Sequence, residues 1–197
     1  MNKKFEFTGE TKAILGNTLH RIRALISFGK VGAGELGGWI EKEENLDASG
    51  NAWVDGNAQV SGNACVYGDA QVCDDARVYG NAQVSGNARV YGDAQVSGNA
   101  CVYGDAQVCD DARVYKRGAI FWISNVGSRD DTATFFACRD KKIKVIVGCF
   151  FGDLDEFAAA VQKTHGDNTH AKVYRLAIEM AKERIKMDDM PEESDDG

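Results

Sequence analysis

The chain lacks any long hydrophobic run, and no window of it approaches the roughly 18 apolar residues that a membrane-spanning helix needs. Its first residues, MNKKFEFTGETK, lack the apolar segment of a secretory signal. It also lacks a basic stripe: the net charge is −7, and the last ten residues, DDMPEESDDG, hold six acidic residues and no basic one. We therefore expect a cytoplasmic protein without membrane contact, and the charge disfavours nucleic acid as a partner.

Metal-binding and disulfide patterns are absent as well. The six cysteines form no C-x-x-C pair and no Cys/His cluster with the spacing of a zinc site. In a reducing compartment such cysteines are expected to be free thiols. Histidine is scarce, with only His20, His165 and His170 in the whole chain. No cofactor is expected from these patterns.

A six-residue repeat dominates the middle of the chain. From Gly50 to Tyr115, eleven hexads follow one another without insertion, beginning GNAWVD GNAQVS GNACVY and ending DDARVY. Every hexad has Ala third and Val fifth, the two-residue period of a short strand with one buried face. Gly, Asn and Asp in the first two positions tolerate the left-handed backbone of a tight corner. Units this short must stack to share a core, so the repeat predicts a β-solenoid.

The hexads resemble those of left-handed parallel β-helices, in which three hexads form one triangular coil. That resemblance implies somewhat under four coils, stacked about 4.8 Å apart. A second period lies on top of the first, because residues 58–79 recur unchanged at 94–115. This 36-residue offset would place each duplicated residue on the same face two coils further along. Either the duplication presents identical groups at fixed intervals, or it records a tandem duplication of a foldable unit.

One corner of the predicted solenoid collects carboxylates. Hexads 5, 8 and 11 share this corner, and its turn positions hold Asp74, Asp75, Asp93, Asp110 and Asp111. Carboxylates in one column repel, so we expect compensation by a hard cation such as calcium, by a basic partner, or by the neighbouring Arg77 and Arg113. The tyrosines recur every twelve residues and should spiral around all three faces. They should therefore make no single aromatic groove for stacking bases.

Different sequences flank the repeat. Residues 1–49, with one expected strand near residues 20–28, would cap the open end of the solenoid, which we place at residues 50–126. Residues 127–187 predict a small α+β domain, preceded by a strand at about 119–126. Its own strands are expected at about 132–138 and 143–150, with one helix capped by Asp153 and a second over about 170–186. The acidic tail, residues 188–197, is expected to be disordered.

A polar loop lies between two of the expected strands of that domain. It contains Ser128, Arg129, Asp130, Asp131 and Thr132, and His165 follows the first expected helix. Arg129 gives this cluster the chemistry to bind an anionic ligand. The alternative is a solvated turn.

Almost the whole chain resembles a family of phage and prophage proteins. The shared segments are LHRIRALISFG and GELGGWIEKEENL before the hexads, and NVGSRDDTATFF, VGCFFGDLDEF and VQKTHGD after them. Members are often labelled acyltransferase-like or polymer-forming because of the hexads. The resemblance implies a phage origin and a role in the host cell, including counter-defence.

Two classes of function follow. The first is a non-catalytic interaction protein that forms homo-oligomers, with a trimer favoured, and binds a host protein or sequesters a small signalling nucleotide. The second is an acyl-CoA-dependent acyltransferase, because many left-handed β-helix proteins are such enzymes. The sequence favours the first, since all three histidines lie outside the hexads and no inserted loop builds a pocket over the coils.

Overall fold

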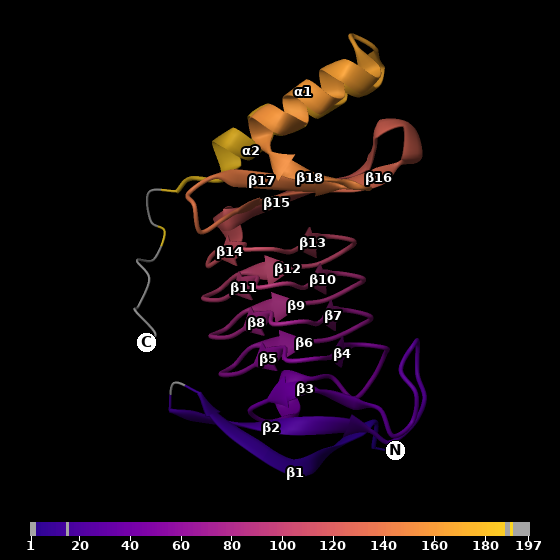
Figure 1. Ribbon diagram of the computed structural model, residues 1–197, viewed down its shortest axis with the longest axis vertical. Coiled ribbons are helices and arrows are strands. Elements are labelled where there is room, and N and C mark those ends of the chain that lie inside the picture. Colours follow the sequence, from indigo (N-terminus) through magenta and orange to yellow (C-terminus); the bar gives the residue numbers. More distant parts are fainter. Residues whose placement is uncertain (1–2, 15, 188–189, 191–197) are drawn as a thin grey trace.

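The hexads form a triangular column of parallel coils (Figure 1). In this computed structural model the described residues are 3–14, 16–187 and 190. Equivalent residues of neighbouring coils pair in parallel 18 positions apart, as Gln59 with Arg77 and Cys65 with Gln83. The alanines and valines of all eleven hexads are at most 1% exposed and fill the interior. The β-solenoid and its three hexads per coil are confirmed.

Three parallel sheets make the faces of the column. The β5 face contains β5 (Gln59–Val60), β8 (Arg77–Val78), β11 (Gln95–Val96) and β14 (Arg113–Val114). The β4 face contains β4 (Trp53–Val54), β7 (Gln71–Val72), β10 (Arg89–Val90) and β13 (Gln107–Val108). The β6 face contains β6 (Cys65–Val66), β9 (Gln83–Val84) and β12 (Cys101–Val102).

The corners between the strands use left-handed backbone, as the turn residues predict. Gly92 has φ +68°, and in two hexads an aspartate replaces the glycine at this position: Asp74 at φ +60° and Asp110 at φ +56°. Aspartate is one of the few residues besides glycine that visit this region routinely. Two of the five aspartates of the acidic corner, Asp74 and Asp110, therefore occupy this constrained backbone position.

An antiparallel meander closes the lower end of the column. It consists of β1 (Phe5–Ile14), β2 (Asn17–Ala24) and β3 (Leu36–Ile40), and β3 then pairs in parallel with β5. The short helix η1 (Glu43–Asn45) ends in a buried asparagine, whose Nδ2 donates to the carbonyls of Gly62 (3.1 Å) and Ala64 (2.8 Å). These hydrogen bonds satisfy backbone groups that a bare solenoid end would expose. The expected cap is present, with three strands instead of the one that was predicted.

A second sheet covers the upper end. Its order is β15 (Ile120–Val126), β16 (Asp131–Ala137), β17 (Ile143–Val147) and β18 (Phe150–Asp153), all antiparallel. The helices α1 (Leu154–His165) and α2 (Thr169–Arg184) lie on the side of this sheet away from the coils (Figure 1). Two short helices, η2 (Arg117–Ala119) and η3 (Gly127–Arg129), flank β15. Because β15 pairs with β16, the coils end before residue 126, earlier than predicted.

The small C-terminal domain has the predicted helices and strands, except that the single strand expected at about 143–150 is a hairpin of two strands, β17 and β18. Asp153 caps α1, accepting hydrogen bonds from the backbone nitrogens of Asp155 (3.1 Å) and Glu156 (3.0 Å), and the Glu156 carboxylate accepts one from Asp153 N (2.9 Å). Thr134 of β16 is fully buried and accepts a hydrogen bond from Gln107 N (3.1 Å), joining the sheet to the last coil. No helix among the described residues is long and apolar enough to cross a bilayer. The predicted acidic tail lies outside the described residues, apart from Met190.

Candidate functional site

The acidic corner is the first predicted site. The hexads bring Asp74, Asp75, Asp93, Asp110 and Asp111 onto one corner column, where the first four are exposed. Neighbouring groups engage several of them: Asn57 Nδ2 donates to Asp75 (3.2 Å), and Gly92 N donates to Asp74 (3.2 Å). In the described ranges, no three Asp, Glu, His or Cys side chains come together in a way that could hold a metal ion. The structure therefore gives the metal hypothesis no support.

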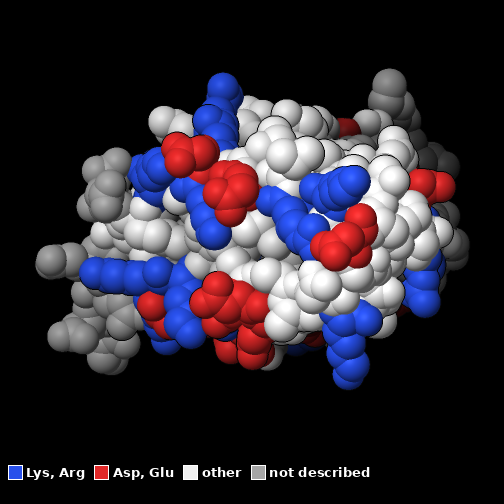
Figure 2. Space-filling view, turned by 90° about the horizontal axis from the view of Figure 1, so that it is seen from above, with Lys and Arg blue, Asp and Glu red and all other residues white. Residues whose placement is uncertain are grey.

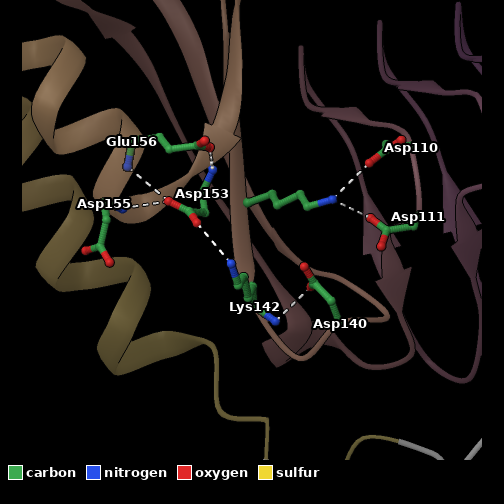
Figure 3. Close-up of polar contacts among 8 residues, drawn as sticks. Asp110, Asp111, Asp140, Lys142, Asp153, Asp155 and Glu156 are labelled. Atoms are coloured by element: carbon green, nitrogen blue, oxygen red, sulfur yellow. Dashed lines mark hydrogen bonds and ion pairs between the residues drawn. The ribbon is translucent and has the colours of Figure 1, made fainter.

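A lysine from the C-terminal sheet compensates the top of this corner. Lys144 of β17 donates from Nζ to Asp110 (2.9 Å) and to Asp111 (2.8 Å). Figure 3 shows the side chains of Asp110 and Asp111 on the coil side of this contact, facing the C-terminal sheet. Burial opposes ionisation of Asp111, but its hydrogen bond and attraction to Lys144 outweigh burial and lower the pKa of this carboxyl. The same two carboxylates raise the pKa of Lys144 against the opposing effect of burial.

Arg77 and Arg113 are the arginines that were predicted to balance this corner. Arg113 donates to the backbone carbonyl of Asp93 (3.3 Å). The interaction of Lys144 with Asp110 and Asp111, which we call the Lys144 clasp, joins the sheet to the last coil. The structure supports a structural role for Lys144, Asp110 and Asp111.

The buried thiols lie close to this clasp. Cys109 and Cys138 are buried, and burial is the main cause that raises the pKa of each thiol. Burial likewise raises the pKa of Cys73 to about 11. Reactive cysteines need a lowered pKa, because the thiolate is the nucleophile. None of these three thiols has the chemistry of a catalytic nucleophile.

The predicted anion-binding loop is the second site. Ser128, Arg129 and Asp130 are exposed, whereas Asp131 and Thr132 begin β16 and are half-buried. Thr132 Oγ1 donates to Ser124 Oγ (2.8 Å).

His165 approaches this loop through a shared neighbour, Tyr174. The rings of His165 and Tyr174 are 5.9 Å apart between centroids, and a Cβ on Gly127 would lie 2.0 Å from the Tyr174 hydroxyl. Burial, and after it the charge of Asp131, raises the pKa of Tyr174. The loop and His165 therefore lie near one another. Neither the loop nor His165 lines the groove on the β6 face or the groove on the β4 face, and anion binding by this cluster stays a prediction.

A groove on the β6 face was not predicted. It has a volume of about 670 Å³ and runs from the coils to the C-terminal sheet. Its aromatic and charged lining residues are Tyr67, Tyr103, Phe121, Trp122, Arg117 and Arg184, and its other lining residues are uncharged. We call it the aromatic–arginine groove. Among the residues that the structure describes, no aspartate or glutamate lines it, so the two arginines are its only charged lining residues there.

Residues distant in sequence build this groove. Tyr67 and Tyr103 are equivalent in the 36-residue repeat and therefore stand two coils apart on one face. Phe121 and Trp122 continue from η2 into β15, where the coils give way to the C-terminal sheet. The tyrosines alternate among the three faces as expected, and only two of them line this groove; the expectation that no aromatic groove forms is wrong because residues after the repeat were not considered. Two tyrosines of one face suffice when the segment after the repeat supplies a tryptophan and a phenylalanine beside them.

A second groove lies on the β4 face. Its volume is about 490 Å³, and Lys30, Asp69, Arg89 and Asp105 are its charged lining residues. Asparagine–aspartate pairs run along its corner, with Asn51 donating to Asp69 (2.8 Å) and Asn87 to Asp105 (2.9 Å). Its two cations and two carboxylates give it no net charge. This groove lacks the chemistry to select an anion.

The helical end of the molecule shows mixed charge. Figure 2 views this end directly and shows Lys and Arg side chains interleaved with Asp and Glu side chains. Nucleic-acid binding typically uses a continuous basic patch or stripe. This face offers none.

Comparison with known proteins supports the fold. Residues 58–72, 70–84, 82–96 and 94–106 match the model of the YdcK beta solenoid repeat. These matches lie within the hexads, and they agree with the parallel coils of the structure. Among curated proteins no match is found.

Proposed function

We propose that this chain is a non-catalytic interaction protein, in which the solenoid is a rigid scaffold that presents a binding groove. The observation that carries the proposal is the aromatic–arginine groove, where two exposed tyrosines, two half-buried aromatic residues and two arginines line one solenoid face. Aromatic side chains and arginine are the residue types that contribute most to recognition surfaces. The coils beneath the groove have fully buried valines, which suits a fixed platform.

The positions of the histidines support binding without catalysis. His20 stacks on Phe7 in the N-terminal meander, with ring centroids 4.7 Å apart, while His165 and His170 belong to the helical end. None of them lines the aromatic–arginine groove. A general base must come within hydrogen-bond reach of the proton it removes. The acyltransferase alternative would therefore need a base other than a histidine at this groove.

We further propose that the protein assembles into a homotrimer through the uncharged parts of its faces, since closed symmetric assemblies are the usual form of soluble oligomers. Following the resemblance to phage proteins, the proposed partner belongs to an infected bacterium. It is a host protein or a small signalling nucleotide, and the proposed role is counter-defence.

Native mass spectrometry of the full chain, with and without acetyl-CoA, tests this proposal. We expect the mass of a trimer and no consumption of acetyl-CoA in the presence of amine and hydroxyl acceptors. A monomer would contradict the assembly. Transfer of the acetyl group to an acceptor would contradict the non-catalytic role and favour the acyltransferase.

A further inference from the structure

We propose that the aromatic–arginine groove binds a nucleotide, a small ligand that combines a planar ring with phosphate. This inference rests on the proposed binding role of the same groove and names the class of ligand. Two features of the groove carry it: a corner between two aromatic rings, and a pair of arginines without a lining carboxylate in the described part of the chain.

The ring corner is formed by Tyr103 and Trp122. Their centroids lie 4.4 Å apart and their planes are nearly perpendicular, at 88°. Tyr103 is 54% exposed, the highest exposure among the exposed tyrosines of the repeat. Two perpendicular rings make an inside corner, where a planar ligand stacks on one ring and meets the edge of the other. Stacking of this kind accepts any nucleobase, because every base has a π-face.

The arginine pair lies along the same groove. Arg184 ends α2, and its Nη2 donates to the backbone carbonyl of Arg117 (3.4 Å), which brings the two residues together. Both residues are exposed, and within residues 3–14, 16–187 and 190 no carboxylate forms an ion pair with either guanidinium group. Guanidinium groups bind phosphate in a bidentate geometry, which makes such a pair suited to a phosphate chain.

Size and charge distinguish this groove from the one on the β4 face. A volume of about 670 Å³ falls within the range of small-molecule sites, roughly 300–1,000 Å³. The β4 groove is smaller, and Asp69 and Asp105 on its lining would repel phosphate. The aromatic–arginine groove is the better match for a ligand with both a base and phosphate.

Isothermal titration of the full chain with ATP tests the proposal, with adenosine and tripolyphosphate as the two halves of the ligand. We expect saturable binding of ATP that is at least about tenfold tighter than binding of either half, because both subsites contribute. No saturable binding of ATP would overturn the proposal. So would equal affinity for ATP and tripolyphosphate, or an affinity about tenfold higher for a single-stranded oligonucleotide, which would assign the groove to nucleic acid.

Matched variants locate the site. Tyr103→Ala should weaken ATP binding about tenfold or more, whereas Tyr79→Ala, at the same hexad position on the β5 face, should leave it unchanged. Arg117→Ala should weaken it about tenfold, and Arg89→Ala on the β4 face should not. Equal losses in both members of either pair would overturn the assignment.

The nucleotide site and the non-catalytic scaffold role can be refuted independently of each other. ATP that binds at the groove and is hydrolysed there would refute the non-catalytic role and leave the nucleotide site standing. A trimer that consumes no acetyl-CoA and binds no ATP would leave the scaffold role standing and refute the nucleotide site.

Discussion

Replacing Phe135 by alanine is expected to lower the free energy of unfolding by about 3–5 kcal/mol. The side chain is fully buried in β16, and its ring lies 5.8 Å from that of Phe121 and 6.1 Å from that of Phe157, between centroids. Removing it leaves a cavity between the sheet and α1. Urea unfolding followed by circular dichroism measures the loss.

Phe151→Ala is the matched control for this change. Phe151 lies in β18 of the same sheet but is 42% exposed, so its loss should cost less than about 1 kcal/mol. If the two variants are destabilised equally, Phe135 is not a core residue and does not pack between the sheet and α1.

Replacing Lys144 by methionine is expected to lower the free energy of unfolding by about 1–2 kcal/mol near neutral pH. The lysine side chain is only 18% exposed and pairs with two carboxylates, which its loss would leave adjacent and uncompensated. Lys142→Met is the matched control, because Lys142 is 59% exposed and forms one longer ion pair, 3.3 Å from Asp153. The control should change stability by less than about 0.5 kcal/mol.

The effect of Lys144→Met should depend on pH in a defined direction. The folded-state pKa of Asp111 is below its ordinary 3.8, so its contribution is present above about pH 4 and is lost as the pH falls further. The folded-state pKa of Lys144 is above its ordinary 10.5, so its contribution is present below that value and is lost as the pH rises through the raised pKa. If the difference in the free energy of unfolding between the unmodified protein and Lys144→Met grows below pH 4, the Lys144 clasp is contradicted.

The sequence predicts the coils well because their determinants are local and repeated. Val and Ala at fixed positions define which side chains point inward, and eleven copies leave no alternative register. The α1 cap is local too, since Asp153 and Glu156 lie three residues apart and form a capping box. The strands β1 and β3 were missed because neither carries the repeat: the register of β1 with β2 shifts at an irregularity between Phe7 and Thr11, and β3 contains two glycines.

The candidate site could not be predicted in the same way. Lys144 lies 33 residues from Asp111, and Arg184 lies 67 residues from Arg117, so no spacing in the sequence connects them. The 36-residue repeat does place Tyr67 and Tyr103 on one face. What was missed is that Trp122 follows the repeat closely enough to stand beside Tyr103, at the point where the coils end.

Photo-crosslinking of the full chain with 8-azido-ATP, with the modified residues identified by tandem mass spectrometry, tests directly whether the aromatic–arginine groove binds a nucleotide. We expect crosslinks at Tyr103 or Trp122 that excess ATP abolishes, because the base would occupy the corner between these rings. Competable crosslinks confined to the loop of Ser128–Thr132, or only crosslinks that excess ATP does not reduce, would contradict binding of the nucleotide in this groove.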